Sequence, residues 1–121
     1  PLVGPSAVLL ALMASGLSGQ CFSFLGYLPV EPRALEIRIR QVERESRERR
    51  CTQLFIETPY RNRSLFRALL RVTRPDTLLC VATNLTTDSE QIATSSIEAW
   101  KLSDPPRFHR QPTVFLLLAA P

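Results

Sequence analysis

Polar side chains follow two apolar segments of this sequence at the point where each segment ends. Four of them come directly after residues 52–56: Glu57, Thr58, Tyr60 and Arg61. Asn84 follows residues 78–83 in the same way. Because open α/β sheets bind ligands at the carboxyl ends of their strands, these residues are candidates for a ligand-binding rim. Two local alternatives stay open: a Glu57–Arg61 ion pair that closes a turn, and an ordinary turn role for Asn84.

The sequence lacks the residue sets of common hydrolytic and metal-dependent enzymes. It has one His, no Cys-x-x-Cys, no glycine-rich phosphate loop and no Gly-x-Ser-x-Gly. His109 lies in a polar Arg-Phe-His-Arg segment, which favours a solvated loop residue over a catalytic base. We therefore predict no metal site and expect the chain alone not to catalyse a reaction.

The positive charge of the chain is moderate. A net charge of +4 and a pI near 9.5 are compatible with a nucleic-acid partner without requiring one. Arg44, Arg47, Arg49 and Arg50 could contact RNA phosphates, but glutamates lie between them. This interleaving favours a solvated helix face over a nucleic-acid patch.

Apolar periodicity predicts the elements that position the polar residues. Strands are expected at 21–28, 52–56, 78–83, 90–96 and 113–119, with helices at 32–50, from Asn62 onward and, for one turn, at 97–102. The continuous apolar runs 78–83 and 113–119 are typical of central strands. With 121 residues and 45% apolar content, we predict one domain, 1–121, with an α/β three-layer sandwich around a mixed five-stranded sheet.

Two details of the predicted helices follow from local patterns. In 32–50, acid-first pairs at i, i+4 (Glu36/Arg40, Glu43/Arg47, Glu45/Arg49) predict a solvated second half. In the next helix, Asn62 is expected to cap the amino end.

The first apolar segment predicts a short helix with a missing partner. Ser6 and Gly16 are favourable caps, and the apolar residues between them point in every direction around the helix axis. Such a helix should be buried nearly all round. It is too short for a bilayer crossing, which needs about 20 residues, so no membrane partner is expected. Because the chain begins at Pro1, we expect it to start inside a longer polypeptide.

The three cysteines are widely spaced. Cys21, Cys51 and Cys80 each lie beside apolar residues at a strand start or interior. Buried free thiols in a reducing cytoplasm are therefore expected.

Four ordered motifs resemble one family over almost the whole chain. These are residues 1–7 (PLVGPSA), 24–29 (FLGYLP), 55–61 (FIETPYR) and 81–86 (VATNLT). The chain resembles the carboxy-terminal domain of the tetrapyrrole methylase superfamily, in particular the branch with small-subunit rRNA ribose 2′-O-methyltransferases. Tyr60, Asn84 and Thr87 depart from that branch, which usually has His, Glu and Lys at these positions.

The resemblance implies a fold, a cofactor and a site. It implies S-adenosylmethionine bound in a cleft between this domain and an amino-terminal one. Cofactor contacts are implied for Ser6, Ala7, Glu57, Thr58, Ala82, Asn84, Pro112, Thr113 and Val114. Tyr60 and Arg61 are candidates for the substrate side, and no catalytic residue is implied.

Several functional alternatives remain open at this stage. The methyl acceptor is a tetrapyrrole or an rRNA ribose 2′-hydroxyl. A different class of function is a non-catalytic dimerisation or RNA-binding module that retains the fold. The expected partners are the protein's own amino-terminal domain and a second copy in a homodimer, and the expected location is the cytoplasm.

Overall fold

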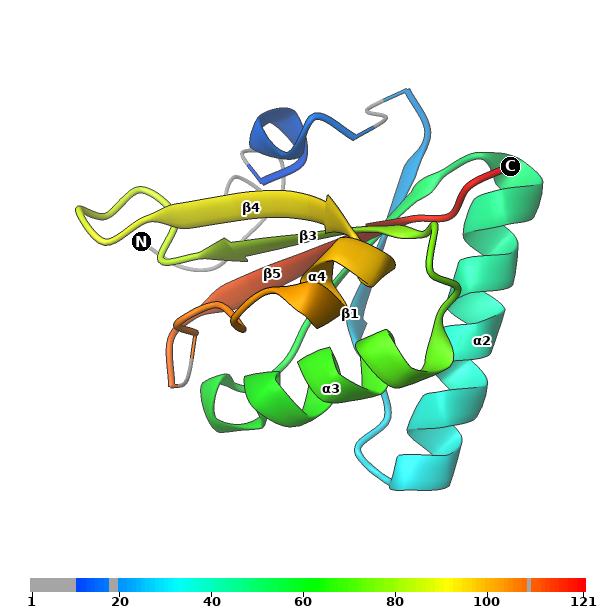
Figure 1. Cartoon of the computed structure of the whole chain (residues 1–121), viewed down its shortest axis with the longest axis horizontal. Helices are drawn as coiled ribbons and strands as arrows, with labels where there is room; N and C mark the ends of the chain where they lie inside the picture. The colour runs from blue at the N-terminus through cyan, green and yellow to red at the C-terminus, as the bar shows by residue number, and fades with distance from the viewer. Residues whose placement is uncertain (1–10, 18–19, 109) are drawn as a thin grey trace.

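The computed structural model describes residues 11–17, 20–108 and 110–121. Its sheet has the strand order β1-β2-β5-β3-β4 (Figure 1). The strands are β1 (Phe22–Tyr27), β2 (Thr52–Ile56), β3 (Leu78–Thr83), β4 (Gln91–Ser96) and β5 (Thr113–Leu118). β1 and β2 pair in parallel, whereas β5 is antiparallel to both β2 and β3, and β4 is antiparallel to β3. The predicted mixed five-stranded sheet is confirmed.

Helices cover both sides of the sheet, so the predicted three layers are also confirmed (Figure 1). On one side lie α2 (Pro32–Arg49), the 3-10 turn η1 (Pro59–Arg61), α3 (Asn62–Val72) and α4 (Ile97–Leu102). The other side is covered by the helical residues 11–15. The predictions that concern Ser6, Ala7 and His109 lie outside the described residues.

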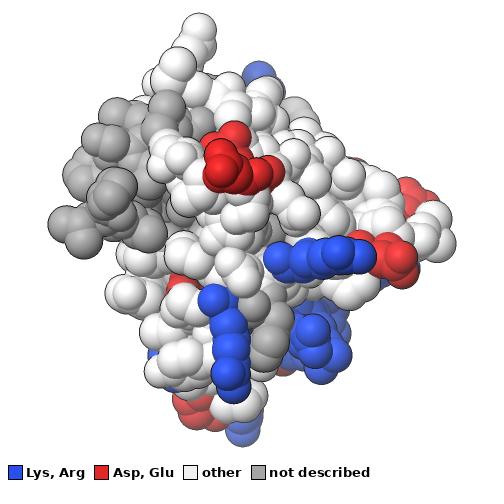
Figure 2. Space-filling view, turned by 90° about the vertical axis from the view of Figure 1, so that its left-hand side faces the viewer, with Lys and Arg blue, Asp and Glu red and all other residues white. Residues whose placement is uncertain are grey.

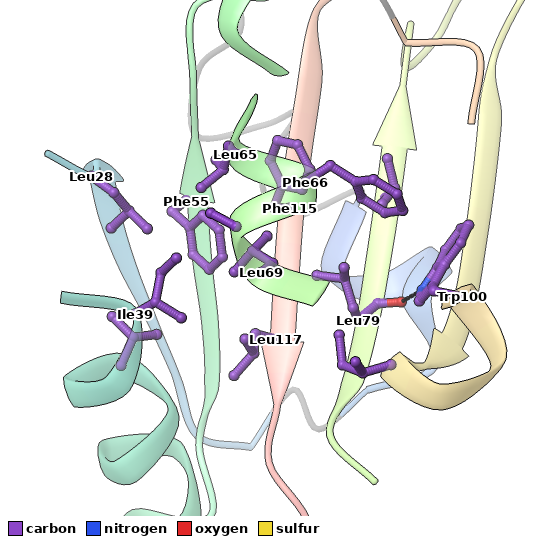
Figure 3. Packing of buried hydrophobic residues seen from close by; sticks show 14 of the residues in the cluster. Leu28, Ile39, Phe55, Leu65, Phe66, Leu69, Leu79, Trp100, Phe115 and Leu117 are labelled. Atoms are coloured by element: carbon purple, nitrogen blue, oxygen red, sulfur yellow. Dashed lines mark hydrogen bonds between the residues drawn. The ribbon is translucent and has the colours of Figure 1, made fainter. Parts of the chain in front are cut away.

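The larger core lies between the sheet and α2, α3 and α4 (Figure 3). Phe55 of β2 and Phe115 of β5 stack with their ring centroids 5.9 Å apart. Phe66 of α3 meets Trp100 of α4 edge-on at 5.4 Å. Alternate residues of β2, β3 and β5 therefore face this core, while Leu54, Cys80, Ala82, Val114 and Leu116 face a smaller core on the opposite side.

The described part of the first helix is buried on one side only. Ala11 and Leu12 are buried, but the side chain of Met13 is 79% exposed. The prediction of burial nearly all round is wrong for these residues, because the described part of the chain supplies neighbours to one side of the helix only. No helix in the described ranges is both long and apolar enough to cross a membrane.

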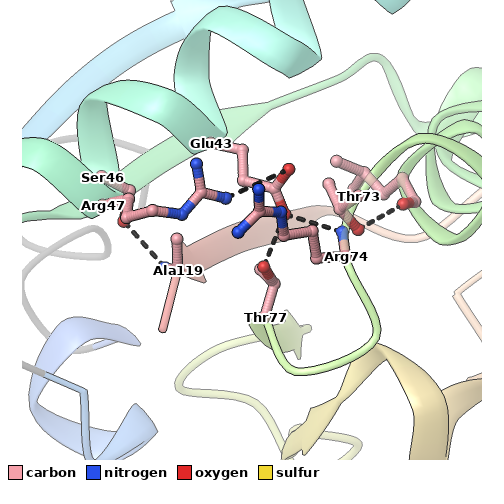
Figure 4. Close-up of polar contacts among 8 residues, drawn as sticks. Glu43, Ser46, Arg47, Thr73, Arg74, Thr77 and Ala119 are labelled. Carbon is pink, nitrogen blue, oxygen red and sulfur yellow. Dashed lines mark hydrogen bonds and ion pairs between the residues drawn. The ribbon is translucent and has the colours of Figure 1, made fainter. Parts of the chain in front are cut away.

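The prediction that the second half of 32–50 is solvated is wrong at two positions, Glu43 and Ser46 (Figure 4). Glu43 accepts hydrogen bonds from the Arg74 amide (2.8 Å) and the Thr77 hydroxyl (2.5 Å). The Ser46 hydroxyl donates to the Cys51 carbonyl (2.8 Å) and accepts from the Ala119 amide (2.9 Å). These bonds tie α2 to the start of β3 and the end of β5, a role that helical periodicity does not show.

The expected ion pairs on α2 form in two cases. Arg40 lies 2.9 Å from Glu36, and Arg47 lies 3.7 Å from Glu43. The guanidinium of Arg40, through its hydrogen bond, holds the pKa of Glu36 below its usual value. Since Glu36 and Arg40 are largely exposed, this pair adds little to stability.

The cysteine prediction is wrong for two of the three residues. Cys21 and Cys51 form a disulfide across the starts of β1 and β2. The two strands meet there because the Thr52 amide donates to the Cys21 carbonyl at 2.9 Å. Cys80 is free and buried as predicted, and burial raises the pKa of its thiol.

We predict that Glu43→Ala destabilises the protein by about 2–4 kcal/mol, because the Arg74 amide and the Thr77 hydroxyl lose their buried acceptor. Urea unfolding followed by fluorescence of Trp100, the single Trp, measures the change. Glu45→Ala, at an exposed position of the same helix, is the control and should shift stability by less than about 0.5 kcal/mol. Equal effects of the two variants would contradict a special role for Glu43.

Candidate functional site

The sheet topology brings three strand ends together at one edge. β5 runs opposite to its neighbours, so its amino end lies beside the carboxyl ends of β2 and β3. In register, Val114 pairs with both Ile56 and Ala82, and Thr113 pairs with Thr83. The residues predicted from these three segments therefore lie side by side, although up to 55 positions separate them in the sequence, from Glu57 to Pro112.

A hollow of about 200 Å³ opens at this edge. Its lining comes from three segments and includes four of the residues predicted to contact the cofactor. The lining residues are Tyr27, Ile56, Glu57, Thr58, Pro59, Pro112 and Thr113. The lining is mainly apolar, and four of its residues are proline or threonine. Such a wall suits a flat, partly polar ring better than a charged group.

Glu57 shapes the loop beside the hollow. Its carboxylate is buried and accepts hydrogen bonds from the Thr58 amide (2.7 Å) and from Nε of Arg61 (3.2 Å). The guanidinium of Arg61 also lies 5.5 Å from the ring centroid of Tyr60. The local ion pair, left open from the sequence, therefore forms, and both charges are engaged in holding the turn 57–61.

Asn84 connects β3 to the segment before β5. Its φ of +53° is a left-handed conformation that Asn tolerates better than most residues. The Asn84 amide donates to the Pro112 carbonyl (3.0 Å), and its side chain donates to Oε1 of Gln111 (2.8 Å). The turn role of Asn84 is confirmed, and this turn sets the position of Pro112 in the lining of the hollow.

Asn62 does not have the predicted role of a helix cap. Arg61 occupies the cap position, and the side chain of Asn62 is fully buried. Its Nδ2 group donates to the Gln111 carbonyl (2.7 Å) and to Oγ1 of Thr113 (3.1 Å), and it also lies 3.3 Å from the Phe108 carbonyl. Asn62 thus anchors Phe108 and residues 111–113 to the start of α3, a contact across about 50 residues of sequence that no local pattern indicates.

The remaining predicted residues occupy different positions. Ala82 and Val114 are buried within the sheet and face the smaller core, so their side chains are not part of the hollow's lining. Tyr60 is 64% exposed beside the turn, and Arg61 is half-buried. Ser6 and Ala7 lie outside the described residues.

Two buried polar atoms near this edge have no hydrogen-bond partner within the described part of the chain. They are Oγ1 of Thr58, in the lining of the hollow, and Oδ1 of Asn62. The described residues contain no group of three or more His, Cys, Asp or Glu side chains that could hold a metal ion. The described residues of this hollow thus offer an apolar surface and hydrogen bonding through the Thr58 hydroxyl.

Comparison with known proteins is consistent with the sequence motifs. No family model matches the sequence. The chain is 36% identical to a ribosomal RNA small subunit methyltransferase I of Vibrio cholerae over 92 residues, which are 76% of this chain and 31% of that protein. It is 29% identical to the protein of the same name in Haemophilus influenzae over 110 residues, 88% of this chain and 38% of that protein.

Solved structures share the fold. The methyltransferase CobJ superposes with a TM-score of 0.59 at 19% identity, over 93% of this chain and 47% of that one. The cobalt precorrin-4 methyltransferase CbiF gives 0.56 at 11% identity, over 93% and 48%. The chain belongs to the tetrapyrrole methylase family. It spans about a third of the length of its curated relatives in this family and about half of the two family structures.

We predict that Asn62→Ala loosens this edge of the family fold. Loss of the Nδ2 donor leaves the Gln111 carbonyl and Oγ1 of Thr113 without their Asn62 contact, at a cost of about 2–3 kcal/mol. The Asn84 amide donates to the Pro112 carbonyl, so its hydrogen exchange should become faster in the variant. The increase should be at least as large as the loss of stability predicts. Ser64→Ala, at an exposed position of the same helix, is the control; matching exchange rates in both variants would contradict the anchoring role.

Proposed function

We propose that the chain forms the carboxy-terminal domain of an S-adenosylmethionine-dependent methyltransferase and contributes one wall of its cofactor and substrate cleft. The observation that carries the proposal is the hollow at the sheet edge, where Glu57, Thr58, Pro112 and Thr113 meet. These are residues for which the motif resemblance implies cofactor contact. The named function of the relatives supports the same class of reaction.

The size of the hollow supports a shared cleft. About 200 Å³ is less than the 300–1,000 Å³ that drug-sized ligands commonly occupy. A hollow of this size accommodates part of a nucleoside cofactor, and a second wall is needed for the rest. The motif resemblance implies an amino-terminal domain as that second wall.

The residues present fit the adenosyl part of the cofactor. Adenine needs hydrogen bonds to its edge and an apolar slot for its ring, and this lining offers the Thr58 hydroxyl and the Ile56 side chain. When bound, S-adenosylmethionine supplies an electrophilic methyl group. The role of this chain is to orient the cofactor: Glu57 holds the turn 57–61, and Asn62 and Asn84 hold residues 111–113 beside it.

We propose RNA of the small ribosomal subunit as the acceptor, through a ribose 2′-hydroxyl. A curated relative named for this RNA is 36% identical over 76% of the chain, whereas the solved structures of CobJ and CbiF are 19% and 11% identical. Transfer to a hydroxyl depends chiefly on aligning nucleophile, methyl group and leaving sulfur, and two domains closing on a substrate supply that alignment. Within this proposal the protein is a cytoplasmic homodimer.

The cofactor site is tested by binding of S-adenosylhomocysteine to the full-length gene product in isothermal titration calorimetry. Thr58→Phe fills the hollow and is expected to weaken binding by about tenfold or more, since one buried steric conflict costs about 1–3 kcal/mol. Ala93→Phe, at an exposed position of the edge strand β4, is the control and should bind normally. Absence of binding by the wild-type protein contradicts the proposed function.

The acceptor is tested separately with radiolabelled S-adenosylmethionine. The full-length protein is expected to transfer label to small-subunit RNA from cells that lack the enzyme, and digestion to nucleosides should place the label on a ribose. Transfer to a tetrapyrrole and not to RNA would contradict the proposed RNA acceptor and identify a tetrapyrrole as the acceptor. A protein that binds S-adenosylhomocysteine but labels neither acceptor would favour the non-catalytic alternative.

A further inference from the structure

A second and larger hollow, of about 460 Å³, lies between α3 and α4. It shares no lining residue with the hollow at the sheet edge. Its lining is Arg63, Phe66, Arg67, Leu70, Trp100, Lys101, Ser103 and Pro105. Three of these eight residues are basic and none is acidic.

The floor of this hollow is apolar and held in place. Phe66 and Trp100 are only 3% and 6% exposed, and their rings meet edge-on at 5.4 Å. The indole N–H of Trp100 donates to the Leu79 carbonyl (2.9 Å), which fixes the ring against β3 (Figure 3). This surface is therefore already ordered before a ligand binds, so little conformational entropy is lost on binding.

The rim carries positive charge that the described residues do not neutralise. Arg63, Arg67 and Lys101 are exposed, and none of the ion pairs formed within the described ranges includes them. Arg63 and Arg67 are also four residues apart on α3, where like charges repel and destabilise a helix. On α2, by contrast, Arg40 and Arg47 each have a glutamate one turn earlier. A rim of this kind is complementary to an anion outside the fold.

The basic rim is continuous with the candidate cofactor edge. The turn that ends at Arg61 leads directly into α3, whose first turn carries Arg63. Figure 2 views the molecule from the side where β3 ends and shows several Lys and Arg side chains in the lower part of that surface. An extended anionic polymer with one reacting group at the edge would have its flanking phosphates near these cations.

We propose that the hollow between α3 and α4 binds the phosphodiester backbone of the RNA substrate, with Arg63, Arg67 and Lys101 on the phosphates and the apolar floor beneath a ribose or base. This inference rests on the proposed function, in which RNA is the methyl acceptor, and it adds the surface that binds the RNA backbone. Grooves that combine cations with aromatic or apolar platforms are the usual form of single-stranded RNA sites.

The test is fluorescence anisotropy of a short labelled single-stranded RNA with the full-length protein. Arg63→Glu/Arg67→Glu should lower affinity by about tenfold or more at low salt. Neutral Arg63→Gln/Arg67→Gln should flatten the slope of log K against log salt by about 1.4, since each lost phosphate contact on a single strand removes about 0.7. Trp100 fluorescence reports whether each variant keeps its fold.

The control is Arg33→Glu/Arg44→Glu, which changes the net charge equally at two exposed positions of α2. Equal loss of affinity in the two charge-reversal variants would overturn the proposal, as would failure of the wild-type protein to bind RNA. So would wild-type binding of an acidic polypeptide, such as polyglutamate, in place of RNA.

This failure is distinguishable from failure of the proposed function. If the wild-type protein labels RNA, and Arg63→Glu/Arg67→Glu labels it with unchanged KM, the hollow is not the RNA site. The protein is then still an RNA methyltransferase. If the wild-type protein binds no S-adenosylhomocysteine, the proposed function itself fails.

Discussion

The position of β5 is the constraint on which the rest of the structure depends. This last strand lies between β2 and β3 and runs opposite to both. Its side chains therefore serve two cores, with Phe115 and Leu117 on one side of the sheet and Val114 and Leu116 on the other. Because β5 is antiparallel to β2 and β3, its amino end lies beside their carboxyl ends. Without this antiparallel insertion, Pro112 and Thr113 would lie at the far end of the sheet from Glu57.

Buried polar groups convert this topology into a defined geometry. Apolar packing between strands and helices has little directional preference, whereas Asn62, Asn84 and Glu43 each form directional hydrogen bonds to groups of another segment. Asn62 and Asn84 hold the segment before β5, and Glu43 holds the segment before β3. Because an unpaired buried donor or acceptor is costly, these contacts specify one arrangement of the loops around the hollow.

The two hollows differ in the chemistry they offer. The one at the sheet edge is small and mainly apolar, and the charge of Glu57 in its lining is neutralised by Arg61. The hollow between α3 and α4 has a rigid apolar floor and an unneutralised basic rim. The first suits a nucleoside cofactor that is recognised by shape, and the second suits a polyanion that is attracted by charge. The proposed methyl transfer to RNA would use both kinds of surface.

The sequence by itself determined the strands, the long helices, the mixed sheet and the residues at the strand ends, because alternation, helical periodicity and turn residues are local properties. Motif resemblance added the family. Tertiary structure alone decided that Glu43 and Ser46 are buried, that Asn62 is an anchor and not a cap, and that Cys21 meets Cys51. It also decided that Arg63, Arg67 and Lys101 surround one hollow, whereas the arginines of α2, more conspicuous in the sequence, lie among their glutamates. These outcomes depend on contacts between segments up to 73 residues apart, such as Ala119 with Ser46, and no local pattern encodes which distant group will arrive beside a given side chain.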